Sequence, residues 1–246
     1  VFCAMRVHRF PEEVVRIYAA QLALVLDYLH GKGILYGDLK PENCLLNEEG
    51  NMVLTDFGLS KVIGRSTLDS PIGSPSYMAP ELLQGHRFNK AVDWWALGCI
   101  IYELVTGKHP FLGPARRVLP ELVLKAEPNL TCPQVKTSAE LNDLVRKFLV
   151  KDPQKRLQHL TDIKIHPFFE GIDWNLIYHR KVRPSVNGKA WKPALTETQK
   201  FDSQAVARGT TLRPSIRGED LDAFVWMGKD MLLTSSITDG SLGAME

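Results

Sequence analysis

Apolar and polar positions alternate along the first half of the chain in blocks long enough to form helices. Pro11, Glu12 and Glu13 predict a helix start, because proline suits the first turn and acidic side chains suit the positive end of the helix dipole. The helix is predicted to run to about Leu29 and to stop at the glycines of segment 31–33. Residues 22–26 are apolar on nearly every side, so we expect this helix to be buried.

Three further segments carry clear signals. Residues 91–106 form a second strongly apolar stretch that ends at Gly107, and residues 141–150 have the spacing of an amphipathic helix. Strand-like runs at 44–46 and 52–54 flank the polar segment 48–51, which is typical of a hairpin turn. The body of the chain is therefore predicted to be mainly α-helical with a small β-hairpin, which makes it α+β overall.

The other segments lack such patterns. Residues 60–75 are polar and contain Gly, Ser and Pro. From residue 183 the chain is rich in Pro, Ser, Thr and Gly and has few apolar clusters. We expect an extended C-terminal tail that crosses the surface or is partly disordered.

Composition narrows the classes of protein. The 246 residues are 44% hydrophobic and 24% charged, with a formal net charge of +2, which argues against a nucleic-acid-binding surface. The longest apolar run, 94–102, is too short to span a membrane, and we expect no signal peptide. No metal-binding pair occurs among the scattered cysteines Cys3, Cys44, Cys99 and Cys132, so we expect no zinc and three small buried thiols. These features favour an intracellular setting, in the cytoplasm or the nucleus.

Three short motifs stand in order between residues 38 and 81. Asp38 is followed five residues later by Asn43, Asp56-Phe57-Gly58 begins thirteen residues beyond Asn43, and Ala79-Pro80-Glu81 closes the series. This order and spacing resemble the catalytic loop, the D-F-G motif and the A-P-E motif of protein kinases. The chain is thus similar to the C-terminal lobe of a eukaryotic protein kinase, with residues 1–169 as its kinase domain. The alternative for Asp38 and Lys40 is a solvated ion pair in a turn.

The resemblance implies a chemical role for the polar residues of this stretch. Asp38 would orient the hydroxyl of a protein substrate and accept its proton, and Lys40 would present a cation to the phosphate in transfer. Asn43 and Asp56 would bind Mg²⁺ through oxygen atoms, as a hard cation requires. The implied cofactors are ATP and Mg²⁺, and the implied cofactor-binding positions are Lys40, Glu42, Asn43 and Asp56. A Lys two positions after Asp38 is similar to the serine/threonine kinases.

Other residues match positions of a kinase scaffold. Asp93 matches a buried Asp that hydrogen-bonds the catalytic-loop backbone, and an Asp in so apolar a helix is costly unless it is satisfied. Glu81 and Arg156 match a buried ion pair. Tyr36 and Phe57 match two members of an apolar column through the kinase core, and packing is the leading interpretation of both.

Several stretches narrow the resemblance to the AGC group, which includes the cyclic-AMP-dependent and ribosomal S6 kinases. Tyr36 stands where most kinases carry His, and residues 73–81 read GSPSYMAPE. Residues 165–169, 171–174 and 180–181 resemble the junction into the AGC C-terminal tail.

The later tail resembles the same group less strongly. Phe201-Asp202 resembles a tail segment that passes near the nucleotide, and residues 221–226 weakly resemble the hydrophobic motif, with Val225 at its phosphorylated position. A chance apolar patch is the alternative for 221–226. The resemblance implies an AGC tail over 170–229, and we expect residues 230–246 to be disordered.

Ser70 stands where AGC kinases carry the phosphosite of the activation loop, four residues before Ser74. A phosphate there orders the loop only if cations pair with it. The usual main partner is an Arg just before the catalytic Asp, and in this chain that residue is Gly37. We therefore expect weak or no coupling between activity and phosphorylation of Ser70 by an upstream activating kinase.

Some kinase features do not occur in these 246 residues. There is no G-x-G-x-x-G loop, no strand Lys paired with a helix Glu, and the chain begins at Val1 near a helix. We expect this polypeptide to be a kinase fragment without its small lobe, to bind ATP poorly and to transfer phosphate negligibly. The alternative is a catalytically inactive, kinase-like binding module or degenerate copy.

Two acidic residues bear on substrate choice. Glu42 and Glu103 match positions that meet Arg residues upstream of the target in basophilic AGC kinases. Backbone or scaffold contacts are the alternative for both. We expect a protein substrate with Arg before the phosphorylated Ser or Thr.

Overall fold

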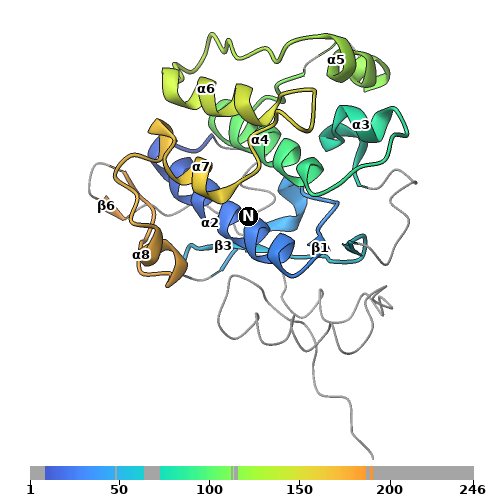
Figure 1. Cartoon of the computed structure of the whole chain (residues 1–246). Coiled ribbons are helices and arrows are strands. Elements are labelled where there is room, and N and C mark those ends of the chain that lie inside the picture. The colour runs from blue at the N-terminus through green and yellow to red at the C-terminus, as the bar shows by residue number, and fades with distance from the viewer. Residues whose placement is uncertain are drawn as a thin grey trace, which may run out of the picture.

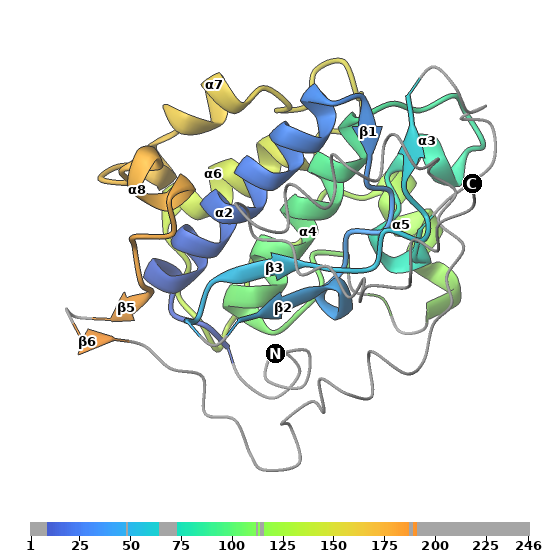
Figure 2. The same ribbon diagram turned by 90° about the horizontal axis from the view of Figure 1, so that it is seen from below.

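Long helices form the centre of the protein. The computed structural model describes residues 9–47, 49–63, 73–111, 113, 116–186 and 189–190. Helix α2 (Glu12–Gly31) packs along α4 (Ala91–Thr106), and α6 (Ala139–Phe148) packs against α4, as Figure 1 and Figure 2 show. The predicted fold class, mainly α with a small β-hairpin, is confirmed, and the structure has a few short antiparallel strands in all.

Helix α4 is buried along its length because nearly all of its side chains are apolar. Every residue except Glu103 is buried, including Trp94 and Trp95. Gly107 ends the helix in the left-handed conformation, with φ 68°, and its N–H donates to the Glu103 carbonyl at 2.7 Å. The bounds predicted for this helix are confirmed.

The other two helices are confirmed with shifted ends. Helix α2 extends two residues beyond Leu29. Helix α6 begins at Ala139, two residues before its predicted start, because the Ser138 hydroxyl caps it and accepts from the Leu141 N–H at 3.0 Å. The apolar periodicity begins only at Leu141, so the pattern of apolar residues could not reveal the cap.

The predicted hairpin is present. Strand β2 (Cys44–Leu46) pairs antiparallel with β3 (Met52–Leu54), in the register that places Cys44 opposite Leu54. The side chain of Gln21, on α2, donates to the Asn51 side chain and accepts from the Met52 N–H, both at 2.9 Å. These two bonds fix the hairpin against the central helix.

Two further strand pairs were not predicted. Strand β1 (Ile34–Leu35) pairs antiparallel with β4 (Lys61–Val62), and β5 (Ser185–Val186) pairs with β6 (Lys189–Ala190). Each strand has two residues, which is too short to show an alternating pattern. The β1–β4 pair places the segment after Asp56 beside the segment before Asp38.

Short elements complete the described part of the chain. The short helices are α3 (Pro80–Leu83), α5 (Leu119–Lys125), α7 (Leu160–Lys164) and α8 (Trp174–Tyr178). The 3₁₀ turns are η1 (Pro41–Asn43), η2 (Pro75–Tyr77), η3 (Arg116–Val118) and η4 (Pro167–Phe169). Ser70, the tail residues 201–202 and 221–226, and the segment 230–246 lie outside the described residues. The predicted division at 169 and 229 stays a prediction.

Three cysteines are buried free thiols, namely Cys44, Cys99 and Cys132. Burial raises the pKa of the Cys44 and Cys99 thiols far above the ordinary value, so both stay protonated and apolar in character. Cys3 lies outside the described residues. Within the described ranges, no helix has the length and apolar character needed to cross a membrane.

Candidate active site

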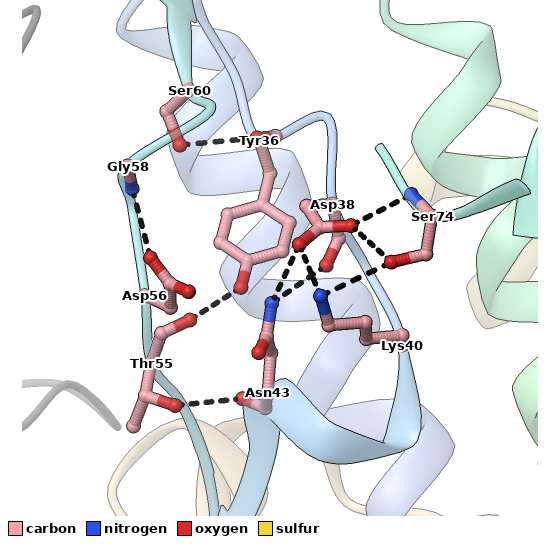
Figure 3. Close-up of polar contacts among 9 residues, drawn as sticks. All are labelled: Tyr36, Asp38, Lys40, Asn43, Thr55, Asp56, Gly58, Ser60 and Ser74. Atoms are coloured by element: carbon pink, nitrogen blue, oxygen red, sulfur yellow. Dashed lines mark hydrogen bonds and ion pairs between the residues drawn. The ribbon is translucent and has the colours of Figure 1, made fainter. Parts of the chain in front are cut away.

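Asp38 lies in a short loop between β1 and η1, and its side chain is only 5% exposed. One carboxylate oxygen, Oδ1, accepts from the backbone N–H and the hydroxyl of Ser74, both at 2.9 Å (Figure 3). The other, Oδ2, accepts from Lys40 Nζ at 2.5 Å and from Asn43 Nδ2 at 3.2 Å. Four donors therefore fix the plane of the carboxylate and neutralise its charge, and Asp38 and Lys40 are not a solvated surface pair.

Ser74 belongs to this group, although the sequence analysis did not count it among the site residues. Its hydroxyl also lies 3.1 Å from Lys40 Nζ, so Ser74 contacts both members of the ion pair. The Ser74 hydroxyl is therefore part of the polar cluster around the Asp38 carboxylate. The available signal was its position directly after Gly73 in the GSPSYMAPE segment.

Asn43 is oriented by the loop that it closes. Its side-chain N–H donates to the Asp38 carbonyl at 2.9 Å as well as to the Asp38 carboxylate. Because the amide nitrogen is turned toward Asp38, the amide oxygen Oδ1 faces the other way. The Asn43 carbonyl accepts from the N–H of Thr55 at 2.9 Å, which ties this loop to the end of β3.

Asp56 follows Thr55 and is exposed. Its backbone is left-handed, with φ 58°, a conformation that Asp tolerates better than most residues. The carboxylate accepts from the Gly58 N–H at 3.1 Å, and in Figure 3 it lies across the Tyr36 ring from Asn43.

The donor set fits Mg²⁺. A carboxylate on Asp56 and an amide oxygen on Asn43 are hard oxygen ligands, and Mg²⁺ usually takes one or two protein ligands together with phosphate oxygens and water. The described residues hold no group of three or more His, Cys, Asp or Glu side chains suited to a metal ion.

Asp93, near the start of α4, fixes the backbone of the loop that carries Asp38. Its carboxylate accepts from the backbone N–H groups of Tyr36 at 3.0 Å and Gly37 at 2.8 Å, and it pairs with His30 Nε2 at 2.8 Å. Asp93 is 1% exposed, so these three partners replace the water that it loses on burial. The buried helix thereby fixes the residues immediately before Asp38.

Tyr36 and Phe57 connect the loop to the D-F-G segment. Their rings meet edge to face with centroids 5.3 Å apart. The Tyr36 hydroxyl donates to the Thr55 carbonyl, and burial raises the pKa of Tyr36 well above its ordinary value, so the phenol remains a donor. The Ser60 hydroxyl donates to the Tyr36 carbonyl at 3.1 Å. Tyr36 therefore makes both packing and polar contacts.

Glu81 and Arg156 form a buried, two-pronged ion pair. Arg156 Nη1 lies 2.7 Å from Glu81 Oε1, and Nη2 lies 2.9 Å from Oε2. The guanidinium also donates to the carbonyls of Ala91, Val150 and Lys151. The pair joins α3 to the start of α4 and to the segment after α6.

Glycines permit the close approach of the segment that carries Ser74. Gly37 has φ 80° and Gly73 has φ 93°, both in the left-handed region. A Cβ on Gly73 would collide with the Gly37 carbonyl oxygen. The backbone of segment 73–74 therefore lies directly on the loop that carries Asp38.

The two acidic residues predicted to select substrates are both half-buried. Glu42 lies in η1, within the loop of Asp38, and Glu103 lies in the last turns of α4. The Tyr77 hydroxyl donates to Glu103 Oε2 at 2.7 Å. Glu103 therefore faces the GSPSYMAPE segment, on the same side of the protein as Ser74.

Comparison with known proteins agrees with this geometry. A family model described as the protein kinase domain matches residues 3–169. Ribosomal protein S6 kinase alpha-2 of Mus musculus is 41% identical over 213 residues, which covers 84% of this chain and 28% of the relative. Protein kinase 3 of Dictyostelium discoideum is 39% identical over 203 residues, which covers 77% of this chain and 21% of the relative. The chain thus spans about a quarter of the length of these relatives.

Proposed function

Because this chain belongs to the protein kinase family, we propose that it carries the catalytic residues of a serine/threonine kinase, which transfers the γ-phosphate of ATP to a hydroxyl group of a protein. The resemblance to the AGC group is confirmed, since ribosomal S6 kinases belong to that group. The observation that carries the proposal is the Asp38 carboxylate, held by Lys40, Asn43 and Ser74 within hydrogen-bonding distance.

The chain's own residues supply positioning and proton transfer. Asp38 accepts the proton of the substrate hydroxyl, and the place now taken by the Ser74 hydroxyl supports this role, because it shows that an alcohol can donate to Oδ1 at 2.9 Å. Lys40 Nζ lies 2.5 Å from Asp38 Oδ2 and 3.1 Å from the Ser74 hydroxyl, so it is placed to stabilise negative charge on the phosphate in transfer. A Lys at this position favours Ser or Thr over Tyr as the acceptor.

Asn43 and Asp56 are the residues that would hold Mg²⁺. When bound, the ion neutralises the charge of the triphosphate. Asn43 is pre-organised because its amide nitrogen is already committed to Asp38. Asp56 is exposed and available to the ligand, and the Gly58 N–H limits the orientations of its carboxylate.

A second candidate is a kinase-like binding module without catalytic activity. Gly37, in place of the usual Arg, favours it. We prefer the interpretation of an active kinase whose nucleotide-binding small lobe lies outside this sequence. The reason is that Asp38, Lys40, Asn43 and Asp56 are all retained.

A phosphotransfer assay on the full-length gene product tests the proposal. We expect transfer from Mg-ATP to serine peptides, and a loss of at least about a thousandfold in Asp56→Asn, because the metal ligand is gone. Asn tolerates the left-handed backbone of position 56, so the fold should persist. Asp162→Asn, at an exposed position on α7, is the matched control.

Nucleotide binding separates the two candidates. If the wild-type protein binds Mg-ATP, detected as a rise in Tm, but transfers no phosphate, the binding module is the better description. Persistent transfer in Asp56→Asn would show that the metal role is wrongly assigned.

We also propose that the substrates carry Arg before the target residue. Glu42 and Glu103 are half-buried carboxylates on the side of the protein that holds Ser74, where an Arg of a bound peptide could pair with them. A peptide array in which Arg gives no gain at any upstream position would contradict this preference.

The proposal includes an intracellular site of action, cytoplasmic or nuclear, and an upstream kinase acting on Ser70.

A further inference from the structure

His109, in the loop that follows α4, is held rigidly although it lies near the surface. Its Nδ1 accepts from the backbone N–H of Phe111 at 3.2 Å. Phe111 is 4% exposed and stacks on Trp95 with centroids 5.5 Å apart and an interplanar angle of 7°. The position of the imidazole is therefore set by the core of the protein.

The imidazole packs edge to face on Tyr77, with centroids 5.6 Å apart and an interplanar angle of 76°. Tyr77 in turn donates its hydroxyl to Glu103 Oε2 at 2.7 Å. Residues from three segments, the loop after α4, the turn η2 and α4 itself, thus form one chain of contacts that ends at a carboxylate.

Neither Tyr77 nor His109 carries a charge in this chain of contacts near neutral pH. Burial raises the pKa of Tyr77, and the Glu103 charge raises it further, so the phenol donates its hydrogen bond without ionising. Burial lowers the pKa of His109 to about 4, so the imidazole is neutral near neutral pH and adds no competing cation. One oxygen of the Glu103 carboxylate is therefore fixed in direction by an uncharged donor.

We propose that His109, acting through Tyr77, is a positioning residue that orients the Glu103 carboxylate toward an Arg side chain of the protein substrate. This inference rests on the proposed function and names a specificity determinant of the same site. A guanidinium binds a carboxylate best in a common plane, with paired N–H donors. A carboxylate whose plane is already set loses less entropy when the guanidinium binds, which raises affinity for Arg above that for neutral side chains.

Kinetics with two peptides test the proposal in the full-length gene product. The peptides differ only by Arg or Ala upstream of the target Ser, and the measured quantity is the ratio of their kcat/KM values. His109→Ala and Tyr77→Phe should each lower this ratio by about threefold to tenfold, the effect of losing one hydrogen bond or ring contact. The loss should fall on KM for the Arg peptide rather than on kcat.

Two variants make the result specific. His109→Phe keeps a ring against Tyr77 and should restore the ratio to within about twofold of the wild type. His86→Ala, at an exposed position after α3, is the control and should leave the ratio unchanged. A ratio that does not change in His109→Ala, or equal losses on both peptides with a lower kcat, would overturn the proposal.

Binding without nucleotide separates this inference from the proposed function. Fluorescence anisotropy of the same two peptides should show tighter binding of the Arg peptide, and this preference should weaken in His109→Ala. If that pattern appears while the wild type transfers no phosphate, the inference stands and the kinase proposal fails. If both peptides are phosphorylated equally well, the kinase proposal stands and the inference fails. A protein that neither prefers the Arg peptide nor transfers phosphate overturns both.

Discussion

Arg156 and Asp93 carry formal charge into the interior, and each is held by several partners. Arg156 is 3% exposed and Asp93 is 1% exposed. Arg156 meets one carboxylate and three backbone carbonyls, and Asp93 meets two backbone N–H groups and an imidazole. If one partner of such a group is removed, the remaining buried polar atoms have neither that partner nor water to bond to. This loss costs more free energy than the hydrogen bond itself contributes.

The Glu81–Arg156 pair gives a direct test of this cost. Arg156→Met should lower the free energy of unfolding by about 3–5 kcal/mol, because it leaves the Glu81 carboxylate buried without a cation. The double variant Glu81→Met/Arg156→Met should recover part of that loss but not all of it, since Ala91, Val150 and Lys151 still lose a donor. Urea unfolding of the full chain measures both values.

An exposed pair is the control for that experiment. Lys155 lies 3.9 Å from Asp152 at the surface, so Lys155→Met should change stability by less than about 0.5 kcal/mol. Arg156→Met with an equally small effect would show that the buried pair does not anchor α3.

His109 makes stability depend on pH. Its pKa falls from 6.5 to about 4 on folding, because burial disfavours the charged ring. Between these pH values the unfolded chain binds a proton that the folded protein resists, so the free energy of unfolding falls as pH falls from 6.5 toward 4. The full contribution, up to about 3 kcal/mol, is present above pH 6.5.

A variant isolates that contribution from other titrating groups. His109→Phe should show a shallower loss of stability than the wild type between pH 6.5 and 4, when urea unfolding is repeated across that range. His86→Gln, at an exposed position, should keep the wild-type slope. Identical slopes for the wild type and His109→Phe would contradict the assignment.

At the scale of elements, close contact between α4 and α6 depends on one glycine. Trp94 of α4 stacks on Phe148 of α6, with centroids 6.2 Å apart and rings nearly parallel at 2°. Beside this stack, a Cβ at Gly98 would lie 2.6 Å from Phe148 Cβ and 3.2 Å from Leu149 Cδ2. The helices can approach this closely only because position 98 has no side chain.

Gly98→Ala should therefore destabilise the protein, although Ala is the better helix former. We expect a loss of about 1–3 kcal/mol from overpacking, measured by urea unfolding. Gly31→Ala is the matched control, because a Cβ at Gly31, the last residue of α2, meets nothing within 4 Å. That variant should be neutral or more stable by up to about 1 kcal/mol. A stabilising effect of Gly98→Ala would mean that α6 can shift to make room.

Comparison of the predicted and observed helices and strands shows which sequence patterns were sufficient to predict them. The long apolar runs predicted α2 and α4. A helix that is apolar on all sides can be assigned to the core from its sequence alone. The start of α6 was misplaced because Ser138 acts through a single local hydrogen bond. The β1–β4 pair was missed because each strand has only two residues and pairs with a segment distant in the sequence, as Ile34 does with Val62.

At the active site the same division holds. Asp38, Asn43 and Asp56 could be selected as candidates because their spacing along the chain is distinctive, and their roles stay predictions. Ser74 and His109 could not, because Ser74 meets Asp38 across 36 positions and His109 meets Tyr77 from a different segment. Their roles depend on how α4 and the GSPSYMAPE segment are packed, which periodicity along the chain does not report.

At the scale of the whole molecule, Gly37 bears on how the protein is regulated. Within the described residues, Ser74 is bound to Asp38 by two hydrogen bonds, and Gly73 beside it packs on the Gly37 carbonyl. A phosphate on Ser70 would have no Arg at position 37 to bind it. Ordering of the site should therefore depend weakly on that modification.

Ser70→Ala and Ser70→Glu should each change kcat/KM of the full-length gene product by less than about twofold. Gly37→Arg should increase the dependence on Ser70, at a cost of about 1–2 kcal/mol in stability, because φ 80° is unfavourable for a residue with a side chain. Peptide phosphorylation before and after phosphatase treatment measures the dependence. Loss of activity in Ser70→Ala would contradict the expectation.

The buried thiols provide a built-in measure of local opening. Cys44 lies in β2, immediately after the loop of Asp38, and Cys99 lies in the middle of α4. Neither can react with an alkylating reagent while it is buried and protonated, so each reacts only during excursions that expose it. Mass spectrometry of alkylation rates at the two sites would compare how often the β2–β3 hairpin and helix α4 open, without any change to the sequence.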